Sequence, residues 1–414
     1  MSSADASLNL AGGGFLRRYR NEIGLLIATF AVIIVTSFFN ESYVERPGEN
    51  VQKILRVTAL LGIFAFGAAT VIIAGGIDLS AGAVIAFSGM LFAGIIVLLA
   101  PQNDRKLPVT SDLDAWIIVT AIAGTLLAAL LIGSFHAWLI TIVRLPPFVA
   151  TLASLVGLRS LAKVVVQNIT SVSHGQGKST ITLDNEALLS VGQRGGWWIP
   201  VVIWFALAVA LWILLSRTVI GRHLYAMGGN EQAARLSGIQ TEKLKWLAYC
   251  ISTTTAAIAG ILYTCYIGTA DPSRDGMGYE LNAIAASVVG GCSLAGGVGT
   301  VTGVMLGALF LRVVIDSVEK SFASRPDLFE GQVVGALVIL AVAFNELRST
   351  SGWRRPFFPG VLGWLNVGIL SGLAGLITGV TSSEDKLRNG LIAGGCVLVL
   401  LMFKAVLERI AERK

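Results

Sequence analysis

Residues Gly75–Met90 read GGIDLSAGAVIAFSGM, with a glycine pair and a single acid placed between two long apolar runs. A second stretch, GGCSLAGGVGTVTGVM, begins at Gly290 and repeats the glycine pair together with a leucine, a glycine and a methionine in register. A helix–hinge–helix unit that occurs twice is typical of transporters whose two halves face a central path. Unrelated glycines are the alternative, because glycine recurs wherever membrane helices pack closely.

The composition places both stretches in a membrane protein. Of 414 residues, 54% are hydrophobic and 14% are charged, and the mean hydropathy is +0.75. A soluble core needs far less apolar surface, so we expect an all-α polytopic membrane protein whose helices contact lipid. The net charge is +6, but the basic residues lie between apolar runs, where they set membrane topology. We therefore expect membrane lipid, and no nucleic acid, as a partner.

The apolar segments can be counted, because a bilayer core needs about 20 apolar residues per helix. The segment at 281–295 is short for a full span, which predicts a broken or re-entrant helix with a hinge at Gly290 and Gly291. In all, about twelve segments are predicted, near residues 22–39, 57–74, 81–100, 115–134, 147–166, 198–215, 247–268, 281–295, 298–318, 331–347, 361–380 and 389–407.

Lysine and arginine collect in cytoplasmic loops, which predicts the orientation of the chain. Basic residues gather in 216–245, whereas acids gather in the loops near 41–49 and 104–114. Counting helices from a cytoplasmic N-terminus places 216–245 and both termini in the cytoplasm, and makes 167–196 an exported loop. The predicted divisions are a cytoplasmic tail, a transmembrane domain and an extension with two further helices, at residues 1–21, 22–347 and 348–414.

The basic loop contains GRHLYAMGGNEQAARLSGIQTEKLKW, Gly221–Trp246, which predicts a short capped helix. Asn230 is a good N-cap, Glu231 suits the positive start of a helix, and Gly238 can end it. Such a helix can dock in the groove of a partner protein. A solvated connector is the alternative reading. The apolar stripe of this helix is predicted at Ala233, Ala234 and Leu236.

Asp78 stands out because an acid among apolar spans is costly and often functional. Its carboxylate could cap the helix that begins with Leu79 and Ser80, contact a polar solute, or relay protons. Arg159, four residues before Lys163, either snorkels to the membrane surface or lines the solute path.

The segment His174–Thr180 reads HGQGKST and ends as a phosphate-binding loop does. The first glycine of such a loop would fall at Val172, and no strand–turn–helix pattern surrounds the segment. We interpret the match as chance and expect this chain neither to hydrolyse ATP nor to bind another cofactor. A helical spacing also predicts a structural ion pair between Arg312 and Asp316.

Four motifs occur together in order: VIIAGGIDLSAGAVIAFSG, PPFVATLASLVGLRSLA, AMGGNEQAARLSGI and ELNAIAASVVGGCSLAGGVGTVTGVMLGALF. Over about residues 50–347 the chain resembles the membrane permeases of bacterial monosaccharide ABC importers of the ribose, galactoside, arabinose and xylose type. The resemblance implies about ten helices of the family type, with the part beyond residue 348 as an addition of unassigned role.

The same resemblance implies partners and a location. They are an ATP-binding subunit that holds ATP and magnesium, a soluble sugar-binding protein, a second permease copy in a homodimer or heterodimer, and the bacterial inner membrane. It makes the short helix a coupling helix, which transmits ATP-driven movement into the membrane. The residues assigned to that helix are Gly229, Asn230, Glu231, Ala233, Ala234, Arg235, Leu236 and Gly238. Those assigned to a solute path or hinge are Gly75, Gly76, Asp78, Ser80, Arg159, Asn282, Gly290, Gly291, Gly296 and Gly297.

Two other classes compete with this interpretation. An ion-driven secondary transporter would use Asp78 as its coupling acid, but it has no need of a helix that docks in a cytoplasmic partner. A membrane enzyme would need a nucleophile, a base and an orienting group, and the sequence offers no such set.

Overall fold

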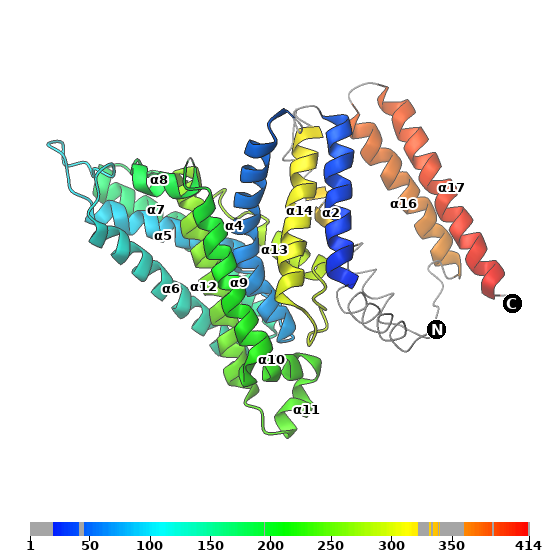
Figure 1. The fold of residues 1–414 in the computed structure, drawn as a ribbon, viewed down its shortest axis with the longest axis horizontal. Coiled ribbons are helices and arrows are strands. Elements are labelled where there is room, and N and C mark those ends of the chain that lie inside the picture. Colours follow the sequence, from blue (N-terminus) through cyan, green and yellow to red (C-terminus); the bar gives the residue numbers. More distant parts are fainter. Residues whose placement is uncertain are drawn as a thin grey trace, which may run out of the picture. The chain divides into compact units, whose positions relative to one another are not determined.

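The computed structural model describes residues 20–40, 45–193, 195–321, 331–332, 334–337, 339, 360–382 and 385–412. The chain divides into two compact units, Met1–Asn345 and Glu346–Lys414 (Figure 1). The elements of the first unit are α2 (Arg20–Phe39), α4 (Pro47–Ile73), α5 (Ala81–Leu99), α6 (Ala115–Thr141), α7 (Pro147–His174), β1 (Ile181–Thr182), α8 (Glu186–Gly192), α9 (Trp198–Arg217), α10 (Val219–Gly229), α11 (Glu231–Leu236), α12 (Thr241–Ile267), β2 (Thr269–Ala270), α13 (Tyr279–Val289) and α14 (Val301–Ser321).

The fold of the described residues is helical apart from a short antiparallel pair, in which β1 binds β2 with Ile181 opposite Ala270. In the part of the chain that the structure describes, ten helices are long and apolar enough to cross a membrane: α2, α4, α5, α6, α7, α9, α12, α14, α16 and α17. The prediction of an all-α polytopic membrane protein is therefore confirmed.

Two of the predicted segments do not appear among these ten helices. The segment at 281–295 overlaps α13, which has 11 residues and runs only from Tyr279 to Val289, so the prediction that this helix is too short to span is confirmed. The segment at 331–347 lies mostly outside the described residues. In addition, α7 continues to His174, so the first part of the predicted loop 167–196 is helical.

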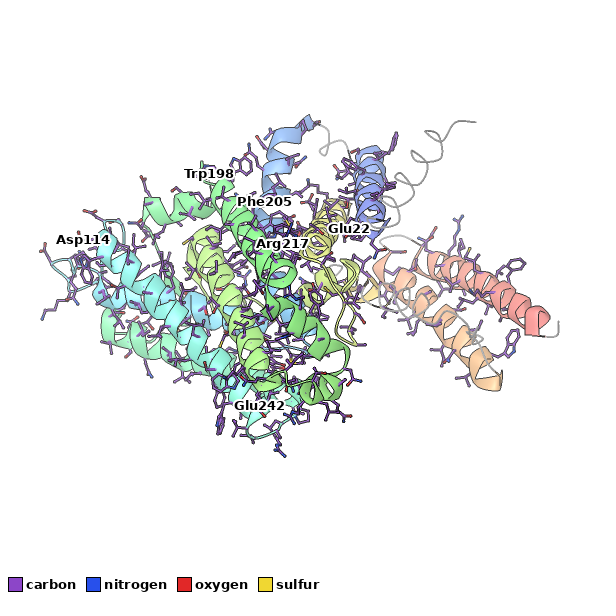
Figure 2. All side chains as sticks on the ribbon, turned by 60° about the horizontal axis from the view of Figure 1, so that its bottom comes forward. Glu22, Asp114, Trp198, Phe205, Arg217 and Glu242 are labelled. Atoms are coloured by element: carbon purple, nitrogen blue, oxygen red, sulfur yellow. The ribbon has the colours of Figure 1, made fainter. Side chains whose placement is uncertain are left out.

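The spanning helices of the first unit form a buried set and an outer set. In α4, 89% of the apolar window is buried, whereas the value for α6 is 22%. α4 is buried because it packs against four other helices, α9, α12, α13 and α14 (Figure 1). Outer helices instead expose large apolar side chains such as Trp198 and Phe205 on α9 (Figure 2). Lipid is the medium that such side chains require.

The end of α4 has a backbone turn that the glycine pair explains. Gly75 has φ +82°, and its N–H donates to the Ile72 carbonyl. The N–H of Gly76 donates to the Val71 carbonyl. This pair of bonds is a Schellman motif, in which glycine is favoured because the left-handed conformation is costly for a residue with a Cβ.

The end of α13 has the same turn. The N–H groups of Gly291 and Cys292 donate to carbonyls of the last helical turn, and Gly291 has φ +96°. By hydrogen-bond pattern Gly75 therefore corresponds to Gly291, whereas the sequence match pairs it with Gly290. The register taken from the sequence was wrong by one residue at this turn, because the match followed residue identity and not backbone conformation.

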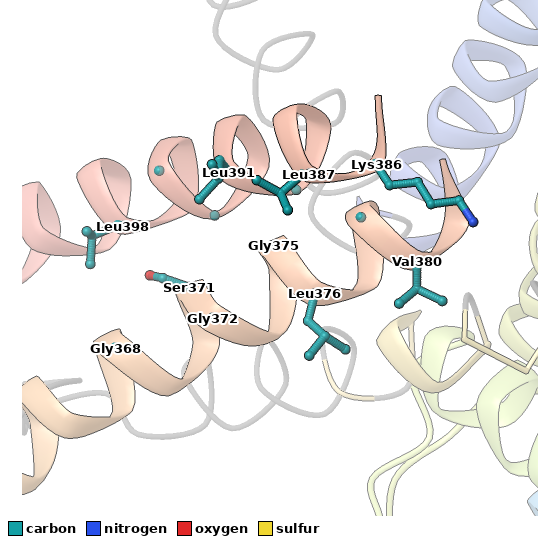
Figure 3. Close-up of a pocket in the computed structure, with 14 residues that line it drawn as sticks. Gly368, Ser371, Gly372, Gly375, Leu376, Val380, Lys386, Leu387, Leu391 and Leu398 are labelled. Atoms are coloured by element: carbon teal, nitrogen blue, oxygen red, sulfur yellow. The ribbon is translucent and has the colours of Figure 1, made fainter. Parts of the chain in front are cut away.

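The second unit contains α16 (Gly360–Thr381) and α17 (Lys386–Glu412), which pack closely through glycines (Figure 3). A Cβ at Gly375 would lie 2.8 Å from the Gly390 carbonyl oxygen and 3.3 Å from the Gly394 Cα. Small residues of this kind let membrane helices approach to backbone contact.

Candidate functional site

The predicted short helix is α11, and it begins and ends at the residues that the sequence predicts. The Asn230 Oδ1 accepts a hydrogen bond from the Ala233 N–H at 2.9 Å, so Asn230 is the N-cap. Gly238 follows the helix with φ +83°, as a C-terminal glycine does. α10 begins in the same way, since the Thr218 hydroxyl accepts from the Gly221 N–H at 3.1 Å. Both helices are therefore rigid, capped elements.

The apolar stripe predicted on α11 was wrong. Ala234 is buried with 5% of its surface exposed and packs into the same apolar core as Met227 and Leu244. Ala233 is exposed, and Leu236 is 89% exposed. The three side chains cannot share a face, because neighbouring helical residues point in directions about 100° apart. Leu236 is therefore the large apolar side chain that α11 presents outward.

Two ion pairs hold α11 against the start of α12. Lys245 Nζ lies 2.6 Å from Glu231 Oε1, and Arg235 Nη2 lies 3.2 Å from Glu242 Oε1. Exposed ion pairs contribute little to stability, so their main effect is to fix the orientation of α11. From the sequence, Glu231 is expected only to favour the start of the helix, and its partner Lys245 on α12 was not predicted.

Three of the predicted glycines, Gly75, Gly296 and Gly297, meet at Gly228, where α10 ends. Gly228, in the last turn of α10, approaches the Ile73 carbonyl so closely that a Cβ would overlap it. The Gly297 N–H donates to the same carbonyl at 2.9 Å. Gly296, with φ +90°, leaves no room for a Cβ, which would lie 2.9 Å from the Gly75 Cα. We call Gly75, Gly228, Gly296 and Gly297 the glycine junction.

The glycine junction joins three elements through backbone contacts: the end of α4, the end of α10 and the loop between α13 and α14. A side-chain bond supports it, since the Tyr225 hydroxyl donates to the Gly299 carbonyl at 2.8 Å. Neither Tyr225 nor Ile73 was predicted as a site residue. The sequence points to Tyr225 only through its position one turn before the Gly228–Gly229 pair, and it gives no sign that Ile73 belongs to the site.

The turn at the end of α13 requires glycine at both Gly290 and Gly291. A Cβ at Gly290 would overlap the Gly303 carbonyl, so α13 and α14 touch backbone to backbone there. A Cβ at Gly291 would make only an ordinary contact, at 3.5 Å from Asn21 Nδ2, so the requirement for glycine there is the left-handed backbone. The two predicted hinge residues therefore need glycine for different reasons.

Asp78 lies 2% exposed between α4 and α5. Its Oδ1 accepts from the Ser80 N–H at 2.8 Å and from the Ser80 hydroxyl at 2.6 Å, and its Oδ2 accepts from the Ser252 hydroxyl at 2.7 Å. The carboxylate therefore binds the turn that precedes α5 and ties it to α12. The N-cap residue of α5 is Ser80. Asp78 therefore stabilises the loop before α5 and is not itself the N-cap of that helix.

Arg159 is half-buried on α7 and donates to two backbone carbonyls, while its place at the membrane surface or on the solute path stays a prediction. Its Nη1 donates to the Pro272 carbonyl at 3.1 Å and to the Asp275 carbonyl at 3.0 Å. These bonds satisfy backbone groups of the irregular segment between β2 and α13, where no helix pairs them. Arg159 therefore holds that segment in place.

In the same segment, burial raises the pKa of Asp275 to about 6, although a hydrogen bond from the Asp271 N–H opposes the shift. A raised pKa means that the folded chain favours the protonated acid. The contribution of protonated Asp275 to the free energy of unfolding is complete at a pH below 3.8, the ordinary pKa of the side chain. It is lost as the pH rises through about 6.

We expect Asp275→Asn, which resembles the protonated acid, to unfold about 2–4 °C higher than the parent chain at pH 7.5 and at the same temperature at pH 4. Thermal unfolding in detergent measures the difference, and the exposed Asp104→Asn is the control. An equal gain at both pH values would contradict the assignment.

The predicted pair between Arg312 and Asp316 was wrong. Arg312 pairs with Glu319 at 2.8 Å, and Asp316 pairs with Lys53 of α4 at 2.9 Å and with Lys320 at 3.0 Å. The helical spacing permits the predicted pair, but the buried Asp316 carboxylate faces α4 instead. Asn282, the remaining predicted residue, lines a separate cavity together with Arg312.

Most of the chain matches a protein-family model and individual permeases of known systems. A family model described as "Branched-chain amino acid transport system / permease component" matches residues 50–343. The chain is 33% identical over 330 residues to the ribose import permease protein RbsC of Bacillus subtilis, covering 79% of this chain and 94% of that protein. It is 35% identical over 342 residues to RbsC of Haemophilus influenzae, covering 82% and 95%.

A third relative is the xylose transport system permease protein XylH of Escherichia coli, which is 30% identical over 386 aligned residues, covering 80% of this chain and 93% of that protein. No solved structure matches the chain significantly. The resemblance noted from the four sequence motifs is thereby confirmed. The chain belongs to the family of transport-system permease components and is a membrane-spanning subunit of an ABC importer.

Proposed function

We propose that this chain conducts a monosaccharide across the bacterial inner membrane, with ATP hydrolysed on a partner subunit that docks on α11. The observation that carries the proposal is the glycine junction, which connects the capped and exposed α11 to the ends of α4 and α10 and to the loop before α14. The names of the ribose and xylose permeases support a sugar as the solute.

The contacts suggest how movement passes inward. Ion pairs and the buried Ala234 fix α11 to α12, and α10 leads directly into α11. At the glycine junction the contacting groups are backbone atoms, which cannot yield as flexible side chains can. A displacement of α11 would therefore shift both glycine turns together, and with them the ends of α4 and α13.

The proposal includes the remaining components of the importer. The partner ATPase binds ATP and magnesium, a soluble sugar-binding protein delivers the solute, and a second permease copy completes the pathway. The loop with α10 and α11 lies in the cytoplasm together with both termini, as the distribution of basic residues indicates.

Asp78 separates this proposal from an ion-driven carrier. We expect Asp78→Asn to keep most of the sugar uptake, because the amide oxygen still accepts from Ser80 and the Ser252 hydroxyl can turn to accept from the amide. Asp78→Leu should lower the unfolding free energy by about 1–3 kcal/mol, because it leaves buried donors unpaired. Uptake and thermal unfolding of both variants measure these effects.

The proposed function is tested by expressing the chain with a candidate ATPase and binding protein from the same organism. Purified together and placed in lipid vesicles, they should import one of a panel of labelled pentoses and hexoses only when ATP is supplied on the α11 side. Uptake of a branched-chain amino acid, with no uptake of any sugar, would contradict the proposal.

A further inference from the structure

A cavity of about 260 Å³ lies among α4, α12, α13 and α14. Its α12 residues, Tyr263 and Tyr266, lie near the C-terminal end of that helix, whereas α11 precedes the N-terminal end. The cavity and the docking helix are therefore at opposite ends of α12. The volume lies just below the range of about 300–1,000 Å³ that is typical of drug-sized ligands, so the space suits a compact solute.

One wall of the cavity is aromatic. Phe64 stacks on Tyr279 with ring centroids 5.6 Å apart and an angle of 9° between the rings. Tyr263 meets Tyr279 edge-on, with centroids 5.8 Å apart and an angle of 87°. These contacts fix the ring of Tyr279 in place. Flat aromatic surfaces stack against the C–H face of a sugar ring, which is the apolar side of an otherwise polar molecule.

Other lining residues are charged, and their charges are paired. Lys53 binds Asp316 at 2.9 Å and Glu319 at 3.2 Å, and Arg312 binds Glu319 at 2.8 Å. A charged solute would have to break one of these pairs or remain unpaired, and both are costly away from water. A neutral solute with several hydroxyl groups can bind such groups without disturbing them.

Asn282 lies on α13 and lines the cavity together with these aromatic and charged residues. Its side-chain amide offers both donors and an acceptor, as a sugar hydroxyl requires. α13 ends at the Gly290–Gly291 turn, and that turn is followed by the loop that joins the glycine junction. A movement of α11 can therefore reach the helix that carries Asn282.

We propose that this cavity binds the transported sugar during its passage, with the aromatic wall that Tyr279 holds together against the sugar ring and Asn282, Arg312 and Glu319 at its hydroxyl groups. The inference rests on the proposed function and adds to it the residues that contact the solute. It predicts a preference for neutral sugars over amino acids, which carry two charges at neutral pH.

The test uses the assembled importer in lipid vesicles and measures sugar molecules imported per ATP hydrolysed. Complexes are isolated through a tag on this chain before they enter the vesicles, so that ATPase without permease does not contribute to the ratio. We expect Tyr279→Leu and Asn282→Leu each to lower the ratio about tenfold, because each removes a contact on which the sugar depends. Phe205→Leu, an exposed aromatic on the outer face of α9, is the matched control and should leave the ratio unchanged.

Asn282→Ser removes the amide without adding bulk, and it replaces Asn282→Leu in the test if leucine prevents assembly. A ratio equal to that of the parent importer in the Tyr279 or Asn282 variants would overturn the cavity assignment and leave the proposed function intact. A parent importer that carries no sugar at all would refute the proposed function and this inference with it.

Discussion

Leu236→Arg is expected to lower ATP-driven sugar uptake by a factor of about 10–100 while the chain still reaches the membrane in normal amounts. Leu236 is 89% exposed at the end of the capped helix α11, so arginine at this position disturbs no packing within the chain. If Leu236 is buried in the groove of an ATPase, the substitution removes about 1.5–3 kcal/mol of apolar burial and adds a charge that the groove must desolvate.

Copurification of the ATPase and sugar uptake measure the effect of Leu236→Arg. Val172→Arg is the matched control, because Val172 is 80% exposed in the last turn of α7, a helix for which no packing against α11 is found among the described residues. Ala234→Arg is unsuitable, because Ala234 is buried and the variant would damage the fold. Wild-type uptake by the Leu236→Arg importer would remove α11 from the docking surface.

Gly296→Ala is expected to abolish most transport and to lower the unfolding temperature by several degrees. Its backbone has φ +90°, which costs a residue with a Cβ about 1–2 kcal/mol. The added methyl group would also lie 2.9 Å from the Gly75 Cα, and a backbone atom cannot move away as a side chain can. Both effects separate the elements that the glycine junction holds together.

The matched control for Gly296→Ala is Gly229→Ala. Gly229 has no atom within 4 Å of an added Cβ and no left-handed backbone, and it ends α10, where alanine is a better helix former. Sugar uptake and thermal unfolding of both variants test whether the glycine junction transmits the movement. If Gly296→Ala transports sugar as well as Gly229→Ala does, the glycine junction does not transmit the movement.

The parts of the fold that follow from local rules could be predicted. Apolar length marks membrane helices regardless of how they pack, so ten of the predicted segments fall on helices long enough to span. The cap at Asn230 and the stop at Gly238 depend only on neighbouring residues, and the hydrogen bond to Ala233 and the left-handed backbone at Gly238 agree with them.

The errors arose where the partner of a residue lies on another element. Ala234 looked like part of an outward stripe because its apolar character does not say which way it faces. Asp316 has a suitable partner four residues before it, yet it binds Lys53 of α4. The glycine junction brings together three distant segments of the chain, and only tertiary structure shows that they meet.

Sugar uptake into vesicles that hold ATP on the α11 side, with the ATPase and the binding protein present and an uncoupler collapsing all ion gradients, distinguishes an ATP-driven importer from an ion-driven carrier. Both the parent chain and Asp78→Asn should continue to import sugar under these conditions, and both should stop when ATP is withheld. Uptake that requires the ion gradient, is indifferent to ATP and is lost in Asp78→Asn would contradict the coupling of transport to ATP through α11.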